Sequence, residues 1–306
     1  MSDSSSRPLV SILTPCFRSA AFLEACIQSV IDQDYPDVEH IIQDGGSDDG
    51  TLEILKRYDE HIEWVSEPDQ GQNDALDKAL KRCRGDIILV LNADDMLLPH
   101  AARWGVENLA RFPDDGVIYG DEYIIDEQEN VLEFYHGPDN YSYDKLLCVE
   151  LVPPAQAAFI RREVMEKVGM GTDPTIKTCP DYEMWVRIGR HFSMRHVPGF
   201  VSKYRRHEGS GTHQSDLIPQ LVSDKRLVMD RVLDDPASPE ELKNLRNRAY
   251  FSLEMWGLCS LLDAQNDGRP ALLRRATASL LANFSRENLR AYLRFFNTWL
   301  AYILRR

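Results

Sequence analysis

Short apolar runs alternate with segments of helical spacing over residues 9–119 of the chain. The runs are rich in Val, Ile and Leu and end in polar or glycine-containing turns, which is typical of buried strands. The predicted strands are Leu9–Thr14, Glu39–Gln43, Ile62–Ser66, Asp86–Leu91 and Val117–Tyr119, and the predicted helices are Ala20–Gln33, Thr51–Tyr58, Asp74–Arg82 and His100–Phe112. This alternation predicts an α/β fold whose mainly parallel sheet is covered by helices on both faces.

The second half of the chain follows a different pattern. The predicted elements are a hairpin at Glu122–His136, a strand near Gln156–Arg161, a helix at Asp181–His191, short strands around Met194–Val197 and Ser202–Arg205, and helices at 216–233, 238–265, 270–283 and 286–304. We therefore expect an N-terminal α/β domain over residues 1–213 and an all-helical C-terminal extension over residues 214–306.

Three polar segments, 44–48, 66–74 and 92–95, directly follow predicted strands. The carboxyl ends of parallel strands meet at one edge of a sheet, where ligands bind. The adjacent acids Asp94 and Asp95 repel each other, and a divalent cation would relieve that repulsion. An isolated Asp-Asp pair more often caps a helix. Three such segments at one edge favour a binding site instead.

Charge is unevenly distributed, with a net charge of −14 for 306 residues. This balance argues against a general nucleic-acid-binding protein. Residues 269–306, however, carry eight arginines and one glutamate. Such a basic segment indicates an anionic partner surface, most commonly the inner face of a membrane. Leu289–Arg306 is predicted to be either an interfacial helix or an ordinary packing helix that joins subunits of a homo-oligomer.

The cysteines and the N-terminal residues indicate in which cellular compartment the protein is expected. The six cysteines form no Cys-x-x-Cys pair, which indicates reduced thiols and neither a disulfide framework nor a zinc site. Met1–Arg7 is polar and is not followed by an apolar signal core, and no apolar stretch reaches the length of a spanning helix. We expect a cytoplasmic protein, with peripheral contact to the inner face of the cell membrane as one role of the tail.

Seven motifs occur in a characteristic order. They are Pro15-Cys16-Phe17, Asp44-Gly45-Gly46-Ser47, Ser66–Ala75, Gly85-Asp86, Leu91-Asn92-Ala93-Asp94-Asp95, Tyr119-Gly120-Asp121 and Asp181-Tyr182-Glu183-Met184-Trp185-Val186-Arg187. In order and spacing they resemble glycosyltransferase family 2, whose members have the GT-A fold, a Rossmann-like fold of nucleotide-sugar transferases. The resemblance covers about residues 8–210 and does not extend to the helical tail.

The resemblance implies a role for each matched position of the donor site. Pro15 and Phe17 match the loop that cradles the base of the nucleotide, and Asp44 matches the acid that reads the base or ribose. Three further residues fall in the loop that lines the donor site, namely Gln72, Asn73 and Asp74.

The resemblance also implies a divalent cation, Mn²⁺ or Mg²⁺. Asp94 and Asp95 match the metal motif, and we favour Asp95 as the ligand and Asp94 as a contact to the sugar. Many relatives carry an acid where this chain has Asn92, which leaves the ligand set open. His207 resembles a late histidine that closes over the diphosphate, as a further ligand or as a structural residue. The arginines beside it are expected to neutralise the leaving group.

Asp181 opens a predicted helix after Pro180, at the position where the family places its catalytic base. Such a base is needed because a hydroxyl group is a poor nucleophile until its proton is removed. The alternative is a helix-capping acid whose carboxylate is engaged with backbone N–H groups.

The resemblance thus implies an inverting, non-processive glycosyltransferase with a nucleoside-diphosphate-sugar donor, most simply a UDP-sugar. The acceptor would be a hydroxyl of a glycan or lipid-linked molecule in cell-envelope polysaccharide synthesis. A dehydrogenase is excluded because no Gly-x-Gly-x-x-Gly follows the first strand. A sugar nucleotidyltransferase is excluded because no glycine-rich basic loop lies near the N-terminus. A non-catalytic nucleotide-sugar-binding or scaffold protein is the alternative, and the acids at 94, 95 and 181 argue against it.

Overall fold

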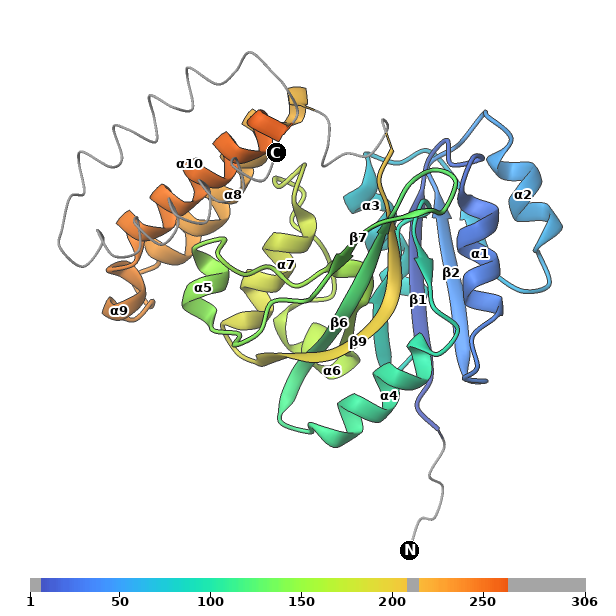
Figure 1. Cartoon of the computed structure of the whole chain (residues 1–306), viewed down its shortest axis with the longest axis horizontal. Helices are drawn as coiled ribbons and strands as arrows, with labels where there is room; N and C mark the ends of the chain where they lie inside the picture. Colours follow the sequence, from blue (N-terminus) through green and yellow to red (C-terminus); the bar gives the residue numbers. More distant parts are fainter. Residues whose placement is uncertain (1–6, 208–214, 264–306) are drawn as a thin grey trace, which may run out of the picture. The chain divides into compact units, whose positions relative to one another are not determined.

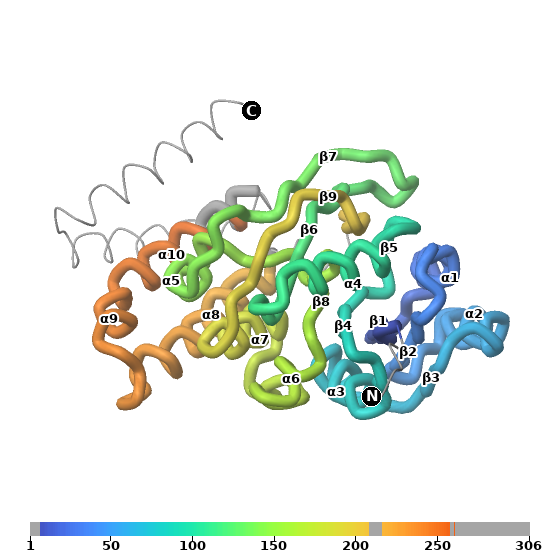
Figure 2. The backbone as a smooth tube through the Cα atoms, turned by 90° about the horizontal axis from the view of Figure 1, so that it is seen from below, coloured from blue at the N-terminus to red at the C-terminus, as the bar shows by residue number. Residues whose placement is uncertain are grey.

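The structure is a computed structural model that describes residues 7–207 and 215–263. These residues form two compact units, one of residues 7–143 and 152–207 and the other of residues 144–151 and 215–263. Figures 1 and 2 show the elements along the chain. The predicted boundary after residue 213 and the predicted helices at 270–283 and 286–304 lie outside the described residues.

The first unit is built on one sheet with the strand order β3-β2-β1-β4-β8-β6-β9-β5, and β7 pairs with β6. The strands are β1 (Val10–Cys16), β2 (Val38–Asp44), β3 (Glu63–Ser66), β4 (Ile87–Val90), β5 (Met96–Leu97), β6 (Asp115–Ile125), β7 (Val131–Tyr135), β8 (Ala158–Arg161) and β9 (Ser193–Arg205). The first four strands pair in parallel, as do β6 and β9. β8 runs antiparallel between β4 and β6 and joins the two parallel sets. The predicted α/β fold with a mainly parallel sheet is confirmed.

Helices cover both faces of this sheet. The first unit contains α1 (Leu23–Ile31), α2 (Thr51–Arg57), α3 (Gln72–Arg82), α4 (Ala101–Arg111), the 3-10 turn η1 (Ala155–Ala157), α6 (Arg162–Val168) and α7 (Pro180–Gly189). Val10 and Ile12 of β1 share a hydrophobic cluster with Cys26 of α1 and Leu109 of α4. Helix α3 lies on the opposite face (Figure 2). Burial on both faces explains why β1 is a continuous run and not an alternating pattern.

Strand β9 is one continuous strand where the sequence predicts two short ones. The predicted break falls at Pro198 and Gly199, residues that usually interrupt a strand. β9 nevertheless pairs in parallel with β6 from Ser193 to Arg205, and the register shifts opposite Tyr119 and Asp121 absorb the interruption. Long-range pairing therefore overrides the local signal.

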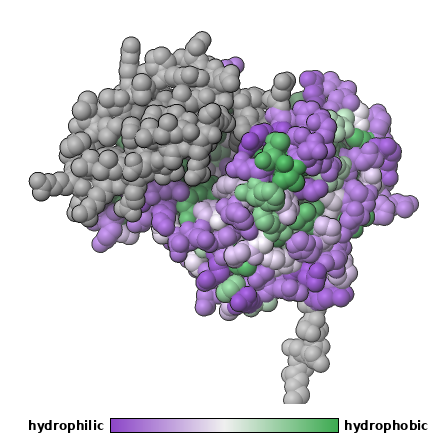
Figure 3. All heavy atoms as spheres, viewed as in Figure 1, coloured by the Kyte–Doolittle hydropathy of each residue, from purple (hydrophilic) through white to green (hydrophobic). Residues whose placement is uncertain are grey.

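The predicted hairpin is confirmed as β6 and β7, and it carries an exposed group of apolar side chains. Val131, Leu132 and Phe134 of β7 are exposed, and Figure 3 shows hydrophobic residues gathered on this face. The rings of Tyr123 and Phe200 stack with centroids 4.3 Å apart, and Phe134 meets both edge-on. These aromatic contacts stabilise the pairing of β6 with its two neighbours.

The second unit is helical in its described residues. It contains α5 (Tyr143–Leu147), the 3-10 turn η3 (Ser215–Leu217), α8 (Ile218–Leu233), α9 (Glu240–Lys243) and α10 (Arg246–Asp263). The guanidinium of Arg248 binds the carboxylate of Glu150 with both contacts at 2.5–2.7 Å, which attaches the segment Asp144–Leu151 to α10. The helix predicted over 238–265 is divided into α9 and α10. No helix among the described residues is long and apolar enough to cross a membrane.

A substitution at Gly105 tests how closely α4 packs on the sheet. A Cβ at this position would lie 2.3 Å from the ring of the buried Phe159. Alanine favours a helix over glycine by about 1 kcal/mol, but overpacking a core usually destabilises by about 1–3 kcal/mol. We expect Gly105→Ala to lower the free energy of unfolding in urea titrations. Glu107→Ala, on the exposed side of the same helix, is the control and should change it by less than about 0.5 kcal/mol. A Gly105→Ala protein as stable as the wild type would contradict this packing.

Glu122 of β6 is a buried acid in the sheet. Burial raises the pKa of its carboxyl group to about 8. Its Oε2 atom has no hydrogen-bond partner among the described residues, as suits a neutral acid. The folded state therefore keeps a proton that the unfolded state, with an ordinary pKa of about 4.3, releases. The stability contributed by this group is complete below the unfolded pKa and is lost as the pH rises to about 8.

We expect Glu122→Gln to leave stability nearly unchanged at acidic pH, because glutamine resembles the neutral acid. Well above pH 8 the variant should be more stable than the wild type by at least about 1 kcal/mol, because no charge has to stay buried. Urea unfolding at about pH 5 and pH 9 measures the difference. Glu127→Gln, an exposed position after the same strand, is the control. A gain that is equal at both pH values would refute the assignment.

Candidate active site

Three strands of the first unit end at the same level of the sheet edge. Cys16 of β1 pairs with Asp44 of β2, and Asp44 pairs with Ser66 of β3. The backbone N–H of Leu91 donates to the carbonyl of Leu13 at 2.9 Å, so the segment after β4 starts beside the same strands. The expected convergence of the polar loops at one edge is confirmed.

The carboxylate of Asp44 holds these loops together. It is fully buried. Its Oδ2 accepts hydrogen bonds from the backbone of Gly46 and Ser47 at 2.9–3.0 Å and from the hydroxyl of Ser66 at 2.6 Å. Its Oδ1 accepts the hydroxyl of Ser47 at 2.5 Å. Asp44 thereby organises the turn after β2 and the start of the loop after β3, and its contact with a base or ribose stays a prediction.

The first loop presents an aromatic ring to the surface. Pro15 lies within β1, and Phe17 directly after the strand is 56% exposed. Arg18 adopts a left-handed backbone conformation with φ of 50°, and its guanidinium binds Asp48 at 2.8 Å. The thiol of Cys16 points inward, and burial and the neighbouring Asp44 raise its pKa, so it is not a nucleophile. An exposed ring of this kind is suited to stacking on a planar base.

The N-terminal turn of α3 brings the three predicted donor-loop residues to the same edge. The side-chain amide of Gln72 donates to Oδ1 of Asn92 at 3.0 Å. The side-chain amide of Asn73 donates to the carbonyl of Ile176. Asp74 accepts the backbone N–H of Gln70 at 3.1 Å and pairs with a lysine one turn on, so it holds the loop before α3 against the first turn of the helix. Gln72 and Asn73 therefore connect α3 to two other parts of the unit.

The acidic motif divides into one exposed and one buried carboxylate. Asp95 is fully buried; its Oδ1 accepts the backbone N–H of Arg205 at 2.8 Å, and its Oδ2 accepts the amide of Asn92 at 3.2 Å. Burial and the nearby Asp94 raise the pKa of Asp95 well above its usual range. The side chain of Asp94 is 30% exposed, and its Oδ2 lies 3.0 Å from Nε2 of His207. The two partly exposed side chains in contact at this motif are thus those of Asp94 and His207.

The hydrogen bonds of Asn92 give a reason why this chain has an amide where many relatives have an acid. Its amide accepts from Gln72 on one side and donates to Asp95 on the other. An ionised acid at this position has no proton to donate to Asp95. The asparagine therefore links α3 to the acidic motif without adding a third charge.

Arg205 is a residue whose role the sequence did not reveal. Its side chain is 2% exposed. It donates to the carbonyl of Asp94 at 2.9 Å and to the carbonyls of Asp126 and Glu127 at 3.1 Å. Its guanidinium also lies 4.8 Å from the ring of Phe22. It therefore ties the acidic motif to the β6–β7 turn, and the expected contact of the arginines beside His207 with a leaving group stays a prediction. Arg205 stands in a run of basic residues, and nothing in the sequence distinguishes a buried arginine from exposed ones in such a run.

The helix α7 presents Asp181 in its first turn. The helix begins at Pro180, and Cys179 is the N-cap residue, without a side-chain capping bond. Among residues 7–207 and 215–263, the Asp181 carboxylate has no hydrogen-bond or ion-pair partner, and it is half-buried. It is therefore not engaged as a capping acid, which leaves it available as a base. Glu183 points elsewhere and pairs with Arg187 at 2.9 Å.

The described residues contain no group of three or more His, Cys, Asp or Glu side chains placed to hold a metal ion. A cation at Asp94 and His207 would therefore need oxygen ligands from a substrate or water, which is common for Mg²⁺ bound beside phosphates.

Comparison with known proteins identifies the family of the chain. The chain matches the family described as Glycosyl transferase family 2 over residues 11–169. It is 28% identical over 187 residues to the putative teichuronic acid biosynthesis glycosyltransferase TuaG of Bacillus subtilis, with 60% of this chain and 72% of that protein covered. Its coverage of other curated relatives ranges down to 28% of their length.

Two solved structures share the fold. The mannosyltransferase PcManGT from Pyrobaculum calidifontis, in complex with GDP-Man and Mn²⁺, matches 97% of this chain and 81% of its own with a TM-score of 0.62 and 20% identity. Residues 1–349 of S. aureus TarS, in complex with UDP-GlcNAc, match 89% of this chain and 88% of their own with a TM-score of 0.55 and 12% identity. Since the family match spans more than half of the sequence and includes the loops after β1 to β4 and the acidic motif, the chain belongs to glycosyltransferase family 2 and has the GT-A fold.

Proposed function

We propose that this glycosyltransferase moves a sugar from a nucleoside-diphosphate donor to a hydroxyl group of a glycan or lipid-linked acceptor, with inversion and one sugar at a time. The proposal rests on the 3.0 Å contact between Asp94 and His207. Asp94 lies in the segment after β4, which starts beside the proposed donor loops. A UDP-sugar is our first choice of donor. The structural relatives were solved with UDP-GlcNAc and with GDP-Man, which supports testing both nucleotides.

Asp94 and His207 are the residues that would hold Mn²⁺ or Mg²⁺. They offer a carboxylate oxygen and an imidazole nitrogen side by side, and both are partly exposed. A bound cation supplies positive charge that stabilises the departing diphosphate. Both oxygens of Asp95 are used inside the protein, so we now favour Asp94 over Asp95 as the ligand and assign Asp95 the positioning of the β9 end.

Asp181 is the proposed catalytic base. Its carboxylate takes the proton of the acceptor hydroxyl as the oxygen forms a bond to the anomeric carbon of the donor sugar. The bond from that carbon to the diphosphate breaks, and its electron pair leaves with the nucleoside diphosphate. The absence of a capping bond to Asp181 within the described residues supports this role.

The name of the Bacillus relative supports a place in cell-envelope polysaccharide synthesis. Contact with the inner face of the membrane, or assembly into a homo-oligomer, is assigned to the C-terminal tail, and residues 264–306 lie outside the described ones. The competing proposal is a non-catalytic nucleotide-sugar-binding or scaffold protein. Hydrolysis of UDP- and GDP-sugars with Mn²⁺ distinguishes the two, because a scaffold would hydrolyse none of them.

The metal assignment predicts unequal effects of two neighbouring acids. Asp94→Asn and His207→Ala should each weaken Mn²⁺ binding in the presence of UDP by more than about 100-fold, because each removes a ligand. Asp95→Asn changes only a group that lies behind the proposed ligands and does not bind the metal, so it should weaken Mn²⁺ binding by about tenfold. Isothermal titration calorimetry measures the affinities. If Asp95→Asn has the larger effect, Asp95 is the ligand and our assignment is wrong.

The base assignment predicts a loss of rate without a loss of binding. Asp181→Asn should lower the rate of sugar transfer by about 10²–10⁴-fold, since a positioned base contributes that much. Its affinities for UDP and Mn²⁺ should stay within about twofold of the wild type, because Asp181 binds neither. Asp114→Asn, an exposed acid before β6 at the far end of the sheet, is the control. Transfer at the wild-type rate by Asp181→Asn would exclude it as the base.

A further inference from the structure

The segment between α6 and α7 is attached to the donor-lining helix α3. The backbone N–H of Thr172 donates to Oδ1 of Asp77 at 2.6 Å, and its hydroxyl donates to the carbonyl of Asn73 at 3.3 Å. The side-chain amide of Asn73 donates to the carbonyl of Ile176. Asn73 is a predicted donor-site residue, so this segment supports the donor site directly. We name residues 169–176 the connecting segment.

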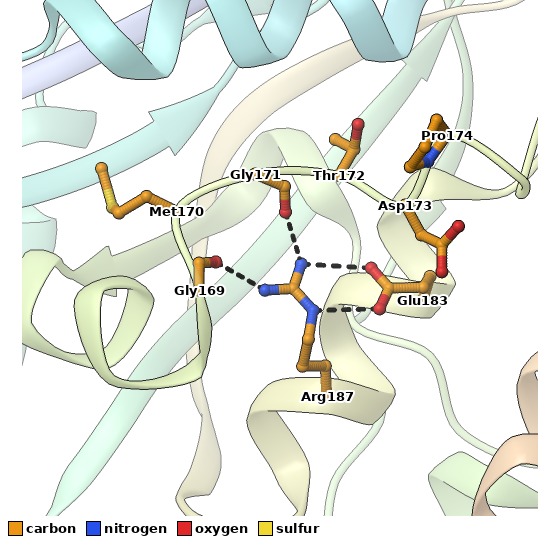
Figure 4. Close-up of a pocket in the computed structure, with 8 residues that line it drawn as sticks. All are labelled: Gly169, Met170, Gly171, Thr172, Asp173, Pro174, Glu183 and Arg187. Carbon is orange, nitrogen blue, oxygen red and sulfur yellow. Dashed lines mark hydrogen bonds and ion pairs between the residues drawn. The ribbon is translucent and has the colours of Figure 1, made fainter.

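The same segment is attached at its other side to α7, the helix that carries Asp181. The guanidinium of Arg187 donates to the carbonyl of Gly169 at 2.6 Å and to that of Gly171 at 2.7 Å. It also binds the carboxylate of Glu183 with two contacts at 2.9 and 3.1 Å. Figure 4 shows the guanidinium between these partners, with Glu183 fixing it from the other side. A planar fork of donors is required for this set of contacts.

Ile176 at the end of the connecting segment is buried, whereas open space borders residues 169–174. A cavity of about 390 Å³ is lined by six consecutive residues of the segment together with Glu183 and Arg187. Gly169 has φ of 106°, a backbone conformation that favours glycine and turns the chain out of α6. Hydrogen bonds to Arg187 and to α3 therefore hold the segment from two sides.

From this geometry we infer that Arg187 is a positioning residue of the transfer reaction. Through the connecting segment it fixes the start of α3, which lines the donor site, relative to the first turn of α7, which carries Asp181. The donor and the base are thereby held at a fixed distance and orientation relative to each other. The inference deepens the proposed function and rests on it for its kinetic consequences, but the attachment itself is testable without any substrate.

Arg187→Lys keeps the charge and loses the fork, so the lysine cannot reach the two carbonyls and Glu183 together. A displacement of about 1 Å between reacting groups can lower a rate by about 100-fold. We expect kcat for transfer to fall by about 10–100-fold and the donor KM to rise several-fold. General destabilisation would lower the amount of active enzyme and would leave the donor KM unchanged.

Asp77→Ala removes the anchor at the other end of the segment, remote from the base. It should also lower kcat, and the double variant Asp77→Ala/Arg187→Lys should be little worse than the poorer single variant, because both changes release the same segment. Arg162→Lys is the matched control. Arg162 also pairs with a glutamate one turn on, at 2.8 Å, and also donates to a backbone carbonyl, but it does not contact the segment. Its kcat should stay within about twofold of the wild type.

Hydrogen–deuterium exchange of the full-length protein without substrate supplies the independent measurement. Arg187→Lys and Asp77→Ala should each increase exchange in residues 169–176 and in the first turn of α3, and Arg162→Lys should not. Unchanged exchange in the first two variants, or effects on kcat that multiply in the double variant, would overturn the inference. Increased exchange in a protein that hydrolyses no nucleotide sugar would support the attachment and refute the proposed function instead.

Discussion

The loops of the proposed donor site depend on the hydrogen bonds of one buried carboxylate, that of Asp44. The parallel register places Cys16, Asp44 and Ser66 side by side, but three strand ends at one level do not by themselves order the loops that follow. Asp44 accepts hydrogen bonds from its own turn and from the hydroxyl of Ser66. A buried carboxylate is tolerated only when it is satisfied in this way. The loops are thus ordered before any donor arrives, which limits the entropy lost on binding.

A second buried group extends this order to the acidic motif. Arg205 holds the backbone of Asp94 and the β6–β7 turn, and its own N–H binds Asp95. The phenyl ring of Phe22 contacts both its guanidinium and the ring of His207. Arg205 and Phe22 thus contact both proposed metal ligands, Asp94 through its backbone carbonyl and His207 through its ring. This is the usual requirement for a metal site, in which outer groups orient the ligands.

The proposed base, Asp181, is supported in a different way. Asp181 lies on α7, outside the parallel part of the sheet, and no strand pairing connects it to the donor loops. Hydrogen bonds of Arg187 and Asn73 to the connecting segment make that connection. A site made of hydrogen-bonded anchors is easier to reposition than one made of packed strands, because each anchor can be released without opening the core.

The fold class and the candidate residues could be predicted from the sequence, because alternating periods indicate a parallel sheet and its loops carry the motifs. The local signals of Pro198 and Gly199 wrongly predicted a break in β9, because the pairing of β9 with β6 overrides them. Local signals also could not separate Asp94 from Asp95. Adjacent acids look equivalent in a sequence, and only the tertiary structure decides that one is fully buried and the other faces His207. The burial of Arg205 was decided in the same way, because desolvation depends on what the whole chain packs around a side chain.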